Sequence, residues 1–189
     1  MQHTQLQRFQ QYISLEKRYS PLTVKEYLSD LNQFFKYLND EYALEKIDEI
    51  THQEIRSWSV YLIEKGLEPT SIKRKLSVLK TYFKFLRKKE VIQQNPMLKV
   101  TAPKVGKTLP GVMEEKSMDQ LLNQIDFGDD FAGQRNRLIL EILYGTGIRR
   151  SELIHLKIGD IDVSQRRIRV TGKGNKQRLV PYTPIIQQL

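Results

Sequence analysis

The sequence predicts a two-domain α+β protein, in which an all-helical N-terminal half precedes a half that mixes helices with a small antiparallel sheet. Apolar residues recur every three or four positions through the first half, as on the buried face of a helix. Short alternating segments around a glycine-rich turn occur only near the C-terminus. Between the halves lies a stretch with Pro96, Pro103, Gly106 and Pro110, and this composition is typical of a linker.

The composition is that of a folded protein with a polyanionic partner. The 189 residues include 31 Lys and Arg against 22 Asp and Glu, which gives a formal net charge of +9 that both halves share. Such a charge points first to nucleic acid. No apolar run reaches the ~18 residues of a membrane span and no secretory signal is visible, so we expect a cytoplasmic protein without a membrane partner. With no cysteine and three scattered histidines, the sequence offers no disulfide framework and no metal-ligand spacing.

Four helices are expected in the first half, each with one apolar face toward a common core. The first is a short stripe from Leu6 to Ile13, and Gly66 is expected to end the third, because glycine accepts a left-handed backbone. The other three helices begin with residues typical of helix N-caps, namely Ser20 before Pro21, Thr51 in a capping box, and Thr70 or Ser71.

The fourth helix has an unusual charge pattern. It carries no acidic residue between Pro69 and Lys89, although helices with solvated faces usually mix charges to gain pairs one turn apart. At ~100° per residue, four of its cations share one flank of the apolar face, which favours contact with phosphates over a simple solvated face. Tyr82 and Phe85 are expected to pack rather than to stack on bases. The residues expected to bind nucleic acid are Lys73, Arg74, Lys80, Lys84 and Arg87.

The second half is expected to contain helices followed by three short strands. Ser117 and Gln120 form a capping box for one helix, and a buried helix through Leu138 breaks at Gly145-Thr146-Gly147. The strands are expected at residues 158–161, 167–170 and 178–180. Residues 172–176, Gly-Lys-Gly-Asn-Lys, are typical of the tight turn of a hairpin.

Two motifs of this half carry a family resemblance. Gly-Thr-Gly-Ile-Arg-Arg-Ser-Glu-Leu at 145–153 and the turn at 172–176, together with the segments from Ser20 and from Ser71, resemble the tyrosine recombinase (lambda-integrase) family, particularly its Xer-type members. The resemblance covers nearly the whole chain. It implies a helical, SAM-like core-binding domain at residues 1–95, a linker at 96–110 and the N-terminal part of a mixed α+β catalytic domain at 111–189.

The resemblance also implies a catalytic site. In this family a tyrosine attacks a DNA phosphodiester and forms a 3′-phosphotyrosine without metal or cofactor. Arg149 corresponds to an arginine that stabilises the phosphorane, Lys173 to the hairpin lysine that protonates the leaving oxygen, and Glu152 to a supporting acid. Without the resemblance, Arg149 would be an ordinary helix-end arginine and Lys173 a turn lysine.

The chain departs from the family pattern in two respects. Arg150 stands where an aliphatic residue is more common, and no histidine is followed three residues later by arginine. No tyrosine occupies the nucleophile position, so we expect a truncated recombinase that binds double-stranded DNA without cutting it. Full-length relatives form tetramers on DNA, whereas this chain is expected to be a monomer in solution. The alternative is a non-catalytic DNA-binding module or truncated regulator.

Overall fold

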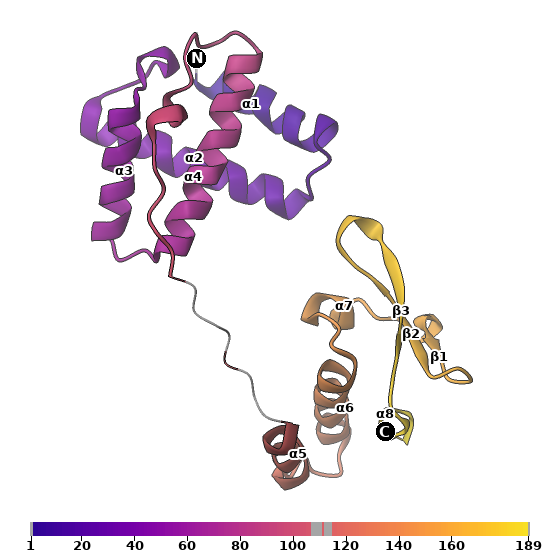
Figure 1. The fold of residues 1–189 in the computed structure, drawn as a ribbon. Coiled ribbons are helices and arrows are strands. Elements are labelled where there is room, and N and C mark those ends of the chain that lie inside the picture. Colours follow the sequence, from indigo (N-terminus) through magenta and orange to yellow (C-terminus); the bar gives the residue numbers. More distant parts are fainter. Residues whose placement is uncertain (1, 107–110, 112–114, 189) are drawn as a thin grey trace. The chain divides into compact units, whose positions relative to one another are not determined.

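The computed structural model describes residues 2–106, 111 and 115–188 of the chain (Figure 1). The chain divides into two compact units, Met1–Thr108 and Leu109–Leu189. Each unit has a hydrophobic core of its own. The observed class is the expected one, a helical unit followed by a unit that mixes helices with a three-stranded antiparallel sheet.

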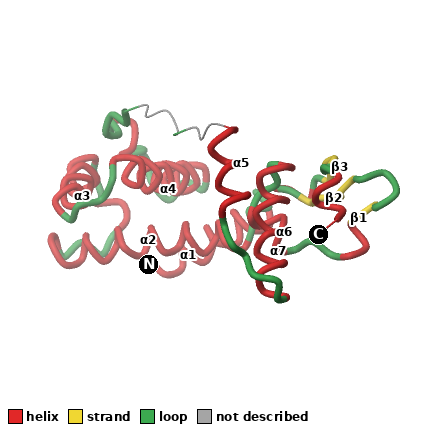
Figure 2. The backbone as a smooth tube through the Cα atoms, turned by 90° about the horizontal axis from the view of Figure 1, so that it is seen from below, coloured by secondary structure: helices red, strands yellow, loops and turns green. Residues whose placement is uncertain are grey.

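The first unit is a bundle of helices. Helix α4 (Pro69–Lys88) contacts both α2 (Pro21–Tyr42) and α3 (His52–Glu64) (Figure 2). A turn of π-helix, Tyr12–Glu16, continues the first helix, and single 3-10 turns occur at Ile47–Glu49 and Pro96–Lys99. The four helices are α1 (Gln2–Gln11), α2 (Pro21–Tyr42), α3 (His52–Glu64) and α4 (Pro69–Lys88).

Local capping determines where most of these helices begin and end. The Ser20 hydroxyl accepts a hydrogen bond from the Thr23 amide at 3.2 Å, and Thr51 forms the predicted capping box with Glu54. Gly66, just beyond α3, has φ of +78°, as expected for the residue after a helix.

The predicted cap of α4 at Thr70 or Ser71 is wrong. The helix begins earlier, at Pro69, with Glu68 in the N-cap position and without a capping hydrogen bond from its side chain. Proline suits the first helical position because its φ is already helical and its missing N–H has no partner there. The proline therefore decides the start of α4.

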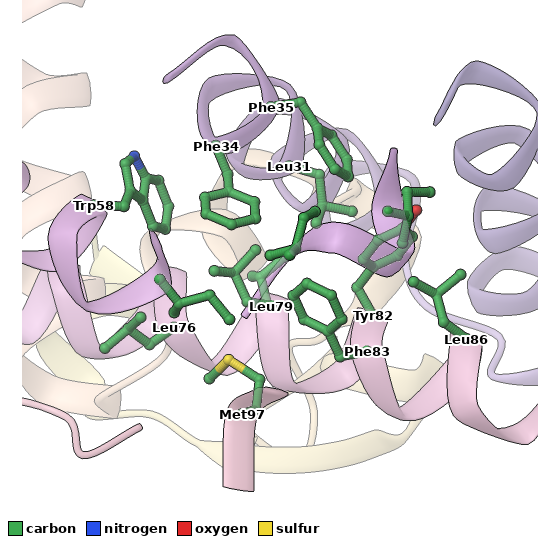
Figure 3. Packing of buried hydrophobic residues seen from close by; sticks show 14 of the residues in the cluster. Leu31, Phe34, Phe35, Trp58, Leu76, Leu79, Tyr82, Phe83, Leu86 and Met97 are labelled. Carbon is green, nitrogen blue, oxygen red and sulfur yellow. The ribbon is translucent and has the colours of Figure 1, made fainter. Parts of the chain in front are cut away.

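The core of the first unit is rich in aromatic side chains (Figure 3). The ring centroid of Phe34 lies 5.0 Å from that of Trp58 and 6.5 Å from that of Phe83. Tyr82 and Phe85 are also buried, which confirms that they pack in the core.

Met97 joins this core, so the first residues of the segment expected as a linker, 96–110, pack on the first unit. Burial of an apolar side chain there extends the unit beyond residue 95. Residues 107–110 of the expected linker lie outside the described residues.

The second unit contains α5 (Glu115–Gln124), α6 (Phe131–Thr146), α7 (Arg150–Ile154) and α8 (Pro184–Gln188). The predicted capping box at Ser117 is wrong, because that residue lies inside α5 rather than before it. Asp130 instead caps the next helix, accepting from the Gly133 amide at 2.8 Å. A side chain caps only when its backbone leaves the helical conformation.

A three-stranded antiparallel sheet follows, in the order β1-β2-β3. Residues 158–160, expected to extend the first strand, form a 3-10 turn because the Asp160 carboxylate accepts from the Lys157 amide at 3.1 Å. Ile168 and Val170 face the small core, and Ile168 pairs with Val180. The strands are β1 (Ile161–Asp162), β2 (Arg167–Thr171) and β3 (Gln177–Pro181). Within the described ranges, no helix combines the length and the apolar character that crossing a bilayer requires.

Candidate nucleic-acid interface and candidate active site

One exposed stripe of α4 carries four cations, Lys73, Lys80, Lys84 and Arg87 (the α4 stripe). Their spacing of seven, four and three residues keeps them within a narrow sector of the helix, while the opposite side packs in the core. Among the described residues, none of the four forms an ion pair. Their charge is therefore available to an external anion.

Arg74 differs from the α4 stripe because it already has an acidic partner. Its Nη1 lies 2.8 Å from Oδ2 of Asp30 on α2, and its Nη2 donates to Oδ1 at 3.1 Å. The neighbouring Lys75 is buried and donates to Asp30 and to Gln33, at 2.7 Å each. Helix α4 itself contains no acidic residue, but Asp30 of the neighbouring α2 provides the acidic partner for Arg74 and Lys75.

The backbone between α6 and α7 positions Arg149. Gly147 ends α6 with φ of +62°, and its amide donates to the Leu143 carbonyl at 3.0 Å. The next side chain, Ile148, is buried in the small core and so anchors the turn. Arg149 follows in an extended conformation as the N-cap of α7, with 70% of its side chain exposed.

Glu152, one turn into α7, is buried and receives four hydrogen bonds. Its Oε1 accepts from Arg149 Nη1 at 3.0 Å and from Arg178 Nη1 at 2.8 Å. Its Oε2 accepts from the Arg149 amide at 2.8 Å and from Arg178 Nη2 at 2.9 Å. The hydrogen bonds from Arg178, and then that from the Arg149 amide, lower the pKa of Glu152 from 4.5 to about 2. The carboxylate is therefore charged at neutral pH.

Sequence reasoning missed Arg178, although the strand pattern contains a signal for it. Arg178 pairs with the buried Val170 across the β2–β3 ladder, and residues that pair face the same side of a sheet. An arginine on the core side of a strand needs a partner for its charge. The sequence shows that need but not that the partner is Glu152, 26 residues earlier.

The hairpin turn brings Gly172 against this cluster. A Cβ at Gly172 would lie 3.2 Å from Oε1 of Glu152, which is tighter than ordinary side-chain contacts. Positive φ angles at Gly174 and Asn175 close the turn, as the sequence predicts. The backbone of Lys173 lies in this turn, but its side chain lies outside the described part of the chain. A cavity of about 620 Å³ adjoins the turn, lined by Arg149, Ser151, Glu152, His155, Thr171 and Gly172.

This arrangement is suited to bind an anion. Two arginines share one carboxylate, so the cluster keeps a net positive charge beside an open cavity. Of the two tyrosines in this unit, Tyr182 is buried in the core and Tyr144 is partly exposed. In the described residues, no group of three acidic or histidine side chains is placed to hold a metal ion.

Two family models match the chain in succession. Residues 6–90 match the phage integrase N-terminal SAM-like domain, and residues 111–188 match the phage integrase family. Tyrosine recombinase XerC of Bacillus pumilus is 37% identical over 174 residues, which are 92% of this chain and 56% of that protein. XerC of Syntrophus aciditrophicus is 38% identical over 182 residues, 93% of this chain and 58% of the relative. The chain thus spans little more than half the length of these relatives.

Solved structures show the same fold at lower identity. A lambda integrase dimer bound to a COC′ core site is 20% identical with a TM-score of 0.73, over 95% of this chain and 59% of that one. The Tn1549 transposon integrase in complex with circular intermediate DNA is 21% identical with a TM-score of 0.70, over 97% and 62%.

Proposed function

The chain belongs to the phage integrase family of tyrosine recombinases, and we propose that it is part of a site-specific DNA recombinase. The whole protein would cleave and rejoin DNA through a 3′-phosphotyrosine, and this chain would bind double-stranded DNA. Residues 1–95 would form the core-binding domain, 96–110 the linker and 111–189 the first part of the catalytic domain. Support comes from the two family models, matched in the order of such proteins, and from the XerC relatives.

The α4 stripe is the main DNA contact in this proposal, and the single observation that carries it is four exposed cations on one face without an acidic partner among the described residues. Lysine and arginine that neutralise phosphates release counterions, which drives binding. Arg74 adds a contact at the edge of the stripe, because 48% of its side chain remains exposed beside Asp30.

Arg149 and Lys173 act on the scissile phosphate, with Glu152 as their support. The Arg149 guanidinium stabilises the extra negative charge of the phosphorane, and the Lys173 ammonium supplies a proton to the leaving 5′-oxygen. This chemistry needs no metal and no cofactor.

We expect none of the tyrosines in this chain to serve as the nucleophile, because none stands at the position that the family uses for it. Tyr82 is fully buried, and burial raises its pKa far above the ordinary value. The chain also has no His-x-x-Arg pair. In this proposal the chain binds DNA without cleaving it. The chain by itself is a monomer in solution and acts in the cytoplasm, whereas the whole protein assembles as a tetramer on DNA.

A gel-shift titration against salt with a duplex of random sequence tests DNA binding by the α4 stripe. Each lost phosphate contact flattens the log–log salt slope by about 0.9. Replacing Lys80 and Lys84 with alanine should therefore flatten it by nearly two. The matched control replaces Lys46 and Lys65, two exposed cations outside the stripe, and should leave the slope nearly unchanged. Equal slopes for both double variants would refute the assignment.

A second candidate is a non-catalytic DNA-binding module, because the four exposed cations of the α4 stripe account for DNA binding without any catalytic residue. The coding sequence downstream of Leu189 separates the two: an open frame with His-x-x-Arg and a late tyrosine supports the recombinase, and a stop codon supports the module. A nicked duplex that carries a site selected from random DNA tests cleavage by the chain itself. A covalent protein–DNA adduct on a denaturing gel would show that one of its own tyrosines is the nucleophile.

A further inference from the structure

The Glu152 carboxylate holds its two arginines unequally. Arg178 directs both terminal nitrogens at the carboxylate, one at each oxygen, at 2.8 and 2.9 Å. Arg149 uses only Nη1, and its Nη2 and Nε make no hydrogen bond to any described residue. Both terminal nitrogens of Arg178 are therefore occupied by the carboxylate, whereas Nη2 and Nε of Arg149 remain free among the described residues.

The two arginine side chains also differ in their exposure to solvent. The Arg149 side chain is 70% exposed and that of Arg178 is 42% exposed, while the carboxylate between them is 3% exposed. The cavity lining includes Arg149 but not Arg178. An anion that enters this cavity meets donors of Arg149 that no described residue satisfies.

We propose that Arg178 is a positioning residue that occupies the Glu152 carboxylate and thereby keeps the Arg149 guanidinium free for a DNA phosphate. The proposal rests on the proposed function, because it takes the anion to be the phosphate that Arg149 binds. A carboxylate and a guanidinium prefer two parallel hydrogen bonds. Without Arg178, Glu152 draws Arg149 into such a pair, and the charge that should meet the phosphate is neutralised.

The same contact joins two separate elements of the site. Glu152 lies in the first turn of α7, three residues after Arg149. Arg178 lies on β3, just beyond the turn that carries Lys173. Gly172 fits closely against Oε1 of Glu152, so a bulkier residue there would have to displace the carboxylate. The hydrogen bonds between Arg178 and Glu152 thus connect the β2–β3 hairpin to α7.

Nitrogen NMR of the arginine side chains tests this without DNA. In the unmodified chain the Arg149 guanidinium, held by a single side-chain hydrogen bond, should still rotate rapidly and give averaged Nη signals. In Arg178→Gln it should pair with Glu152 through two bonds and give resolved Nη signals. Glu152→Gln combined with Arg178→Gln should restore free rotation, since a neutral amide does not hold the guanidinium. Arg169→Gln is the charge-matched control, because Arg169 pairs with Leu179 across the ladder, on the face opposite Arg178.

Unchanged Arg149 signals in Arg178→Gln would overturn the proposal. If that variant does not fold, Arg178→Lys answers the same question, since lysine keeps the charge but cannot occupy both oxygens in a fork. It should give Arg149 signals between the two extremes, and signals identical to the unmodified chain would again overturn the proposal.

The salt dependence of binding to a random-sequence duplex then connects the contact to DNA. Arg149→Gln and Arg178→Gln should each flatten the slope by about 0.9, and the double variant by no more than either alone. Additive losses would mean that Arg178 contacts DNA itself, which contradicts a positioning role. An unaltered slope in Arg149→Gln would contradict the proposed function at this site, while the NMR result would still decide the role of Arg178.

Discussion

Among the described residues, each unit buries one carboxylate that pairs with two basic side chains, yet the two clusters differ in what they leave exposed. Asp30 in the helical unit binds Arg74 and Lys75, and Lys75 is itself buried, with 8% of its side chain exposed. Glu152 in the second unit binds Arg149 and Arg178, both of which reach solvent.

A buried acid therefore does not by itself indicate a binding site. Asp30 connects α2 to α4 beside a large aromatic core, and its lysine is satisfied entirely within the protein. Glu152 lies beside a small core, where the exposed arginines keep donors for a ligand. The exposure of the cations separates a packing contact from a binding site.

Replacing Asp30 should have the largest effect, because it leaves Lys75 buried without a counter-charge. We expect Asp30→Ala to lower the free energy of unfolding of the first unit by about 3–5 kcal/mol. Urea unfolding followed by fluorescence of Trp58, the single tryptophan, measures this unit directly. The control is Asp40→Ala, which removes an exposed carboxylate paired with Lys36 and should leave the midpoint almost unchanged. Equal midpoints for the two variants would contradict the packing role of Asp30.

The core of the first unit also contains Tyr82, whose buried hydroxyl, unlike the Asp30 carboxylate, has no partner among the described residues. Its hydroxyl makes no hydrogen bond within the described part of the chain. Tyr82→Phe removes this unsatisfied group and should raise the free energy of unfolding by about 1 kcal/mol. Tyr37→Phe is the matched control, because the Tyr37 hydroxyl bonds to Ser57 at 2.7 Å and its loss should destabilise. A loss of stability in both variants would show that the Tyr82 hydroxyl is satisfied in solution.

The acid dependence of the second unit is expected to be the smallest effect near neutral pH, where Glu152 stays charged and its contribution to stability is intact. Because the pKa of Glu152 is lowered from 4.5 to about 2, its contribution to stability is present above about pH 4.5 and is lost as the pH falls toward about 2. Urea unfolding monitored at the amide of the buried Val170 should show this loss. Glu152→Gln should show a flatter acid profile, and identical profiles would mean that Glu152 is not held in its charged form.

The local structure was largely predictable from the sequence. Ser20 and Thr51 cap their helices as expected, and the glycine-rich turn joins β2 to β3. Two expected caps were wrong, at Ser117 and at Thr70 or Ser71, because a residue that favours a cap also tolerates the first turns of a helix. The assigned roles of Arg149, Lys173 and the α4 stripe remain predictions, but the sequence was sufficient to select those residues.

Capping, periodicity and turn chemistry act between residues a few positions apart, so the helices and the hairpin can be predicted from the sequence alone, and the motifs at 145–153 and 172–176 indicate the family by resemblance. Which charges are free depends on the tertiary structure. Arg74 meets Asp30 across 44 positions and Arg178 meets Glu152 across 26. Ion pairs depend on distances in space, and periodicity along one element says nothing of the element packed against it. The acid-free pattern of α4 therefore concealed the partner of Arg74, and the strand pattern concealed that of Arg178.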